Sequence, residues 1–264
     1  MTHSHTASPG SSTTPLSCRR RSPTDSSDAK PGMRRKRIVA LLPPTPLLIP
    51  EVTGHALYPA RLRTKIDRAQ QWILPTDGPI TIAFHPDESM ATCHVGSLKA
   101  WGIDVNVGAG TYLPDIVLRA LLRRWGYDGE INSVDISGVQ FRTDDGPLLI
   151  AADGGAGLHP DAPLGDVPGA WALEEQLRRL VIDPASQASA PLFDMAAAVD
   201  CGITPEPWVV WADFCRFHPS SVSTLYHWSS IDERADTITE QQGGPPAYGG
   251  IGFHCGVWQL TTVM

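Results

Sequence analysis

Short apolar runs alternate with longer segments of helical periodicity along most of this chain, which is typical of an α/β fold. Runs that suit buried strands lie at residues 38–42, 79–84, 103–107, 131–136 and 147–151. A glycine-rich run over residues 248–258 predicts one further strand at the end of the chain.

Amphipathic segments separate these runs, with apolar residues recurring three and four positions apart. They predict helices at about residues 57–74, 113–125, 168–182, 192–199 and 206–215. The best-marked helix has Pro114 in its first turn and Gly126 at its end. We therefore expect a single three-layer α/β domain over residues 38–264, with a central, mostly parallel or mixed sheet and helices on both faces.

Residues 1–37 differ in composition from the rest of the chain. They hold eight Lys or Arg and two Asp, which gives a net charge of +6. Residues 38–264 therefore carry a net charge of −13, and the whole chain carries −7. Their Ser, Thr and Pro content and lack of apolar periodicity predict a disordered basic arm. Met33 also offers a second start, so residues 1–32 need not belong to the mature protein.

The charge and cysteine content bound the function. An acidic body is a poor partner for nucleic acid, whose binding depends on Lys and Arg at phosphates. Arg34–Arg37 before the apolar run 38–42 imitates a secretory signal, but prolines interrupt the run at once and it is too short to span a membrane. The five cysteines form no Cys-x-x-Cys pair, so we expect a reduced, cytoplasmic protein without a structural zinc site.

Two histidines directly follow predicted strands. His85 comes after the run 79–84, and His159 lies behind the glycine-rich segment 154–157 that follows the run 147–151. Loops at the carboxyl ends of parallel strands share one edge of a sheet, so His85 and His159 should open into one cleft. The chain lacks a complete Gly-x-Gly-x-x-Gly, a P-loop, a Gly-x-Ser-x-Gly elbow and a His-Glu-x-x-His pair.

Several short motifs occur in the order seen in the LigB-like family, the catalytic subunit of class III extradiol ring-cleavage dioxygenases, which is related to Memo-like proteins. They are residues 47–51 after a proline-rich strand end, the His85 loop, the Gly-Gly-x-x-x-His loop at His159, the helix at about 170–180 and residues 206–211. The chain resembles most an actinobacterial branch of that family, over roughly residues 38–260. The resemblance implies the three-layer α/β fold already expected.

The resemblance also implies a site for Fe(II), held in the family by two histidines and a glutamate. His85 corresponds to the second metal histidine, Glu206 to the carboxylate ligand and His159 to the acid/base histidine. The family's first histidine falls at residues 43–46, Pro-Pro-Thr-Pro, where no side chain is a good ligand. His55, His94 and His254 are candidates to replace it, although the family pattern predicts none of them.

Two functions therefore stay open. One is a non-haem Fe(II) dioxygenase acting on a catechol-like substrate, with His159 moving the substrate proton. The other is a non-catalytic LigB-like protein, a pseudoenzyme that keeps the cleft for a small aromatic or diol ligand or for a partner. Purely structural roles are also expected alternatives for His85 at a turn, for His159 on a surface loop and for Glu206 in the first turn of a helix.

Three tryptophans suit a core position better than a ring-binding cage. They are Trp208, Trp211 and Trp258.

Overall fold

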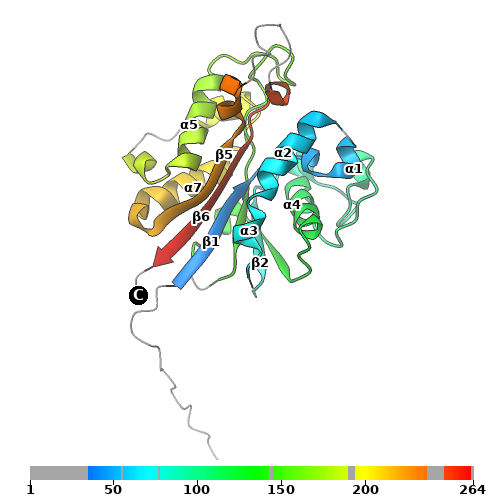
Figure 1. Ribbon diagram of the computed structural model, residues 1–264. Helices are drawn as coiled ribbons and strands as arrows, with labels where there is room; N and C mark the ends of the chain where they lie inside the picture. The colour runs from blue at the N-terminus through cyan, green and yellow to red at the C-terminus, as the bar shows by residue number, and fades with distance from the viewer. Residues whose placement is uncertain are drawn as a thin grey trace, which may run out of the picture. The chain divides into compact units, whose positions relative to one another are not determined.

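One mixed sheet runs through the protein (Figure 1). The computed structural model describes residues 35–54, 56–76, 78–142, 145–189, 194–236 and 247–262. The six strands of the sheet lie in the order β3-β2-β4-β1-β6-β5. Their bounds are β1 Arg35–Leu42, β2 Ile80–Phe84, β3 Ile131–Asp135, β4 Leu148–Ala151, β5 Val222–Ser229 and β6 His254–Thr262.

Strands β1 to β4 are parallel to one another, whereas β6 runs antiparallel to both β1 and β5. Each parallel connection contains helix or a long loop, as such crossovers require. The helices are α1 Pro50–Thr53, α2 Leu57–Asp67, α3 Gln70–Ile73, α4 Leu113–Arg124, α5 Ala170–Ile182, α6 Met195–Asp200 and α7 Pro205–Phe217. The carboxyl ends of β1, β2, β3 and β4 consequently share one edge of the sheet.

Alternate residues of the strands enter two different cores. In β1, Val39 and Leu41 pack against α5, α6 and α7, while Ala40 and Leu42 pack against α2, α3 and α4. Figure 1 shows α5 and α7 on one side of the sheet and α2, α3 and α4 on the other. The expected single three-layer α/β domain with helices on both faces is thus confirmed, and so is burial of the three tryptophans, each 0% exposed.

The sheet begins earlier than expected. The predicted basic arm over residues 1–37 falls mostly on residues outside the described ranges, but Arg35, Lys36 and Arg37 belong to β1 and pair with β6. Arg37 is buried because its guanidinium donates to the carbonyl oxygens of Gly146 and Gln140 and lies beside Asp145. Internal acceptors therefore allow a basic residue to enter the sheet.

Three strand expectations need correction. Residues 103–107 form no strand and pack as a loop against the first turns of α4. The last strand starts only at His254, because Tyr248, Gly249 and Gly250 have positive φ and form a turn that extended backbone cannot continue. Strand β5 was not expected, since its mixed polar sequence shows no clear alternation.

No helix in the described ranges is both long enough and apolar enough to cross a membrane.

Candidate functional site

Four loops meet at the carboxyl edge of the parallel strands. His85 follows β2 directly, Pro44 lies in the loop after β1, Asp153 follows β4, and Thr204 precedes α7. Together they border a small cleft of about 50 Å³. Its lining residues are Pro44, His85, Asp87, Met90, Leu113, Pro114, Ala151, Asp153 and Thr204. Strand-end loops therefore form a site where this class of fold binds ligands.

His85 and Glu206 lie close together at this edge. His85 Nδ1 is 3.9 Å from Glu206 Oε2, and the side chains are 35% and 37% exposed. The distance is too long for a hydrogen bond but short for two groups that share one ligand. Glu206 lies in the first turn of α7, behind Pro205, where the helix dipole favours a carboxylate. The structure thus brings together two of the three residues named from the sequence.

Asp87 and Asp135 add negative charge near His85. The Asp87 carboxylate accepts a hydrogen bond from Ser89 N at 2.8 Å, and Asp135 accepts one from Ser137 N at 2.8 Å. These backbone hydrogen bonds lower the pKa of each aspartate, and the charge of His85 lowers it further. Both carboxylates are therefore ionised at neutral pH.

Asp153 connects the loop after β4 to α7. Its Oδ1 accepts from Thr204 N at 3.1 Å, and its carbonyl oxygen accepts from Trp208 Nε1 at 2.8 Å. Burial raises the pKa of Asp153 to about 6, against the opposing hydrogen bond from Thr204, and the charge of Glu174 contributes to the rise. The Asp153 carboxyl therefore gains its charge near pH 6.

His159 is bound to its own loop. Its Nδ1 accepts from Asp161 N at 3.1 Å, and the Asp161 carboxylate lies 3.5 Å away. A Cβ at Gly250 would lie 2.7 Å from the Cβ of His159, so the turn before β6 packs directly on this histidine. Neither His159 nor Glu206 is among the described residues that line the cleft. The acid/base role of His159 stays a prediction.

The donors do not make a complete site for iron. In the described parts of the chain, no group of three or more His, Cys, Asp and Glu residues is arranged to hold a metal ion. Residues 43–46 supply no substitute, because Thr45 accepts a hydrogen bond from Leu47 N and caps the 3-10 turn Pro46–Leu48. His94 is exposed elsewhere, His254 is buried, and His55 lies outside the described residues. The three-ligand arrangement of the family does not fit the described residues.

A second pair, Glu174 and His254, was missed from the sequence. Both side chains are 0% exposed, and His254 Nε2 lies 2.7 Å from Glu174 Oε2. The other carboxylate oxygen of Glu174 accepts a hydrogen bond from Gly155 N. The sequence did contain a signal: Glu174 stands three residues before Leu177 and seven before Val181, on the apolar face of its helix.

The Glu174–His254 pair holds the loop that carries the cleft residues. A Cβ at Gly252 would overlap the Glu174 carboxylate, and Cβ atoms at Gly154 and Gly155 would lie about 3 Å from it. Trp208, which bonds to Asp153, also packs edge-on against His254 at 5.5 Å. The buried pair therefore fixes the backbone on which Asp153 stands.

The chain was compared with known proteins. No protein-family model matches it, and no significant match was found among curated proteins.

Proposed function

We propose that this chain is a LigB-like binding protein that holds a small hydroxylated ligand in the strand-end cleft and does not cleave aromatic rings. The observation that carries the proposal is that His85, which lines the cleft with Asp153, lies 3.9 Å from Glu206, while no group of three donors in the described chain is arranged to hold a metal ion. Residues that only orient the ligands do not replace a missing metal ligand.

The size of the cleft limits the ligand. Small-molecule pockets usually measure 300–1,000 Å³, whereas this cleft measures about 50 Å³. A ligand can therefore place one or two hydroxyl groups in the cleft, and any aromatic ring must stay outside it. A vicinal diol meets this requirement.

The charges define the ligand's polarity. Glu206 and the ionised Asp87 are acceptors, so they favour a ligand that donates hydrogen bonds. His85 either donates or accepts, depending on its protonation state. The acidic surroundings oppose an anionic ligand, so we propose a neutral diol.

The second candidate is the iron-dependent dioxygenase. It is favoured by the same two side chains, since His85 and Glu206 correspond to two of the three expected ligands. Fe(II) would supply oxygen activation there, but the described residues leave one ligand position unassigned.

One set of variants tests the proposal. We expect the wild type to bind a vicinal diol such as catechol, in a calorimetric titration, with at least fivefold weaker binding for His85→Ala and Glu206→Ala. His218→Ala, an exposed histidine after α7, is the matched control and should bind normally. Absence of diol binding would refute the proposal.

Anaerobic Fe(II) titration separates the two candidates. We expect weak Fe(II) binding by the wild type, and stronger binding by Pro44→His, which adds a donor at the cleft. When catechol and O₂ are then added, the wild type should cleave no ring. Stoichiometric Fe(II) binding that both His85→Ala and Glu206→Ala abolish would instead support the dioxygenase.

A further inference from the structure

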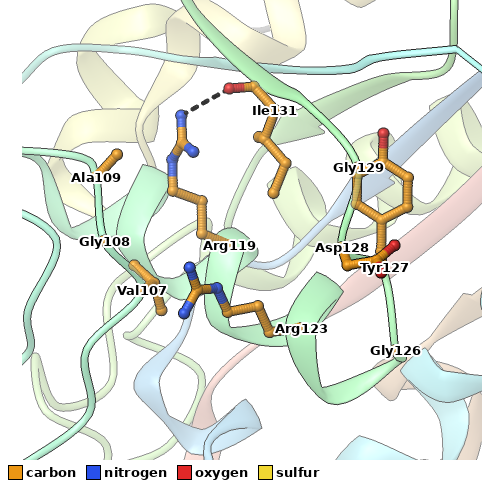
Figure 2. Close-up of a pocket in the computed structure, with 10 residues that line it drawn as sticks. All are labelled: Val107, Gly108, Ala109, Arg119, Arg123, Gly126, Tyr127, Asp128, Gly129 and Ile131. Carbon is orange, nitrogen blue, oxygen red and sulfur yellow. Dashed lines mark hydrogen bonds between the residues drawn. The ribbon is translucent and has the colours of Figure 1, made fainter.

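A much larger cavity, of about 540 Å³, lies beside the second half of α4 (Figure 2). It is lined by Val107, Gly108, Ala109, Arg119, Arg123, Gly126, Tyr127, Asp128, Gly129 and Ile131. Its volume falls in the usual range for small-molecule sites. None of these residues lines the strand-end cleft, so the cavity is a separate feature of the molecule.

Arg119 presents a fixed guanidinium group on the wall of this cavity. The residue is only 8% exposed. Its Nε donates to Asp115 at 2.9 Å, and its Nη2 donates to Ser133 Oγ at 2.7 Å and to Ile131 O at 3.2 Å. Within the described chain, Nη1 of Arg119 has no hydrogen-bond acceptor. In a buried guanidinium, each nitrogen normally has an acceptor. Arg119 is therefore positioned in advance to donate into the cavity.

Arg123 lies one helical turn after Arg119 and faces the same cavity (Figure 2). Its one hydrogen bond in the described chain is a long one, 3.3 Å, from Nη1 to Asn106 O. The neighbouring Arg124 differs, because both of its Nη atoms donate to the Asp67 carboxylate. Of these two exposed arginines, Arg124 is therefore paired with a carboxylate, whereas Arg123 has no carboxylate partner in the described chain.

The remaining walls favour a ligand that is partly apolar. Val107, Tyr127 and Ile131 supply apolar surface, and Gly108, with a φ of 82°, brings the backbone close to the Arg123 guanidinium. Asp128 also lines the cavity and limits the negative charge that it accepts. These features suit one anionic group attached to an apolar body.

We propose that this cavity binds a singly phosphorylated small molecule, with its phosphate between Arg119 and Arg123 and its apolar body on Val107, Tyr127 and Ile131. Phosphate suits the site better than carboxylate, since its three terminal oxygens can accept from two guanidinium groups together. The strand-end cleft has no part in this binding.

Calorimetric titration of the full chain with phenyl phosphate, inorganic phosphate and benzoate tests the proposal. We expect phenyl phosphate to bind at least tenfold more tightly than inorganic phosphate, because only phenyl phosphate carries an apolar body, and benzoate to bind more weakly than phenyl phosphate. Equal binding of phenyl phosphate and inorganic phosphate would overturn the assigned apolar contact, and tighter binding of benzoate would overturn the choice of phosphate.

Variants locate the site. Arg123 is exposed, so Arg123→Gln should fold normally and should weaken phenyl phosphate binding at least tenfold. Arg61→Gln, an exposed residue of α2 that lines neither the cavity nor the cleft, makes the same charge change and should leave binding within twofold. No binding of phenyl phosphate at millimolar concentration, or equal losses in both variants, would refute the site.

Discussion

The two histidine–glutamate pairs of this domain lie in opposite environments. Glu174 and His254 are 0% exposed and 2.7 Å apart, whereas His85 and Glu206 are more than one-third exposed and 3.9 Å apart. Desolvation makes a buried pair costly to break, even though His254 Nδ1 has no hydrogen-bond partner among the described residues. An exposed pair contributes little to stability. The comparison indicates that Glu174–His254 maintains the structure and that His85–Glu206 is available to a ligand.

Asp153 links the two pairs. Its pKa is raised by burial and by the charge of Glu174, and its side chain accepts from the residue that precedes α7, the helix of Glu206. The buried pair therefore influences the cleft through the position and the protonation of Asp153.

The largest effect is expected for Glu174→Ala. This change leaves the Nε2–H of His254 and the N–H of Gly155 without their acceptor, so it should lower the free energy of unfolding by about 3–5 kcal/mol, measured by urea denaturation. Replacing Glu174 and His254 together by leucine should cost less than the single change. A loss below about 1 kcal/mol for Glu174→Ala would show that the buried pair contributes no more to stability than an exposed pair does.

Gly252→Ala tests the packing around the buried carboxylate. The new Cβ would overlap Glu174, so we expect a loss of roughly 1–3 kcal/mol in the same denaturation assay. Gly138→Ala is the matched control, because a Cβ there would meet nothing within 4 Å. Similar losses in both variants would show that the effect belongs to glycine itself.

The titration of Asp153 gives an effect that depends on pH. Its pKa is about 6 in the folded chain and 3.8 in the unfolded reference, so between these values the folded state binds more protons. The contribution of Asp153 to stability therefore falls as the pH rises from about 4 to 6. Because one pKa unit corresponds to about 1.4 kcal/mol, the fall is at most about 3 kcal/mol.

Asp153→Asn keeps an oxygen that accepts from Thr204 N, but its amide cannot ionise. The variant should therefore not show the loss of stability between about pH 4 and 6 that the Asp153 carboxyl causes. The measurement is the difference in unfolding free energy between wild type and variant at pH 4, 5, 6 and 7. Parallel curves for the two proteins would contradict the raised pKa.

The smallest effect on stability is expected at the cleft. His85→Ala and Glu206→Ala should each change the free energy of unfolding by less than about 1 kcal/mol, because partly exposed charge pairs contribute little. The same variants should bind the diol at least fivefold more weakly. Thermal denaturation alongside the diol titration measures both, and a large loss of stability would assign His85–Glu206 a structural role.

Local patterns predicted much of the fold. The apolar runs of β1, β2, β3 and β4 and the periodicity of α4, α5 and α7 were read correctly, because each pattern reflects which faces of one element are buried. Residues 103–107 show the limit of such patterns. An apolar run indicates that its residues are buried, but it does not indicate whether they pair with another strand or pack against a helix.

The site was predicted in part for a related reason. The sequence alone was enough to place His85 at the end of a strand and Glu206 at the start of a helix. Their approach to 3.9 Å depends on strand order and on the start of α7, which are set by contacts between distant segments. The packing of Gly250 on His159 likewise depends on the turn before β6, far along the chain from His159.

The sequence by itself determined the class of fold, the two faces of each strand and the placement of His85 at a strand end. Only the tertiary structure decided which side chains meet, because Glu174 and His254 are 80 residues apart in the sequence. The cavity lined by Arg119 and Arg123 likewise joins a loop, a helix and the start of a strand. The physical reason is that periodicity arises within one element, whereas burial of a charge depends on partners that other elements supply.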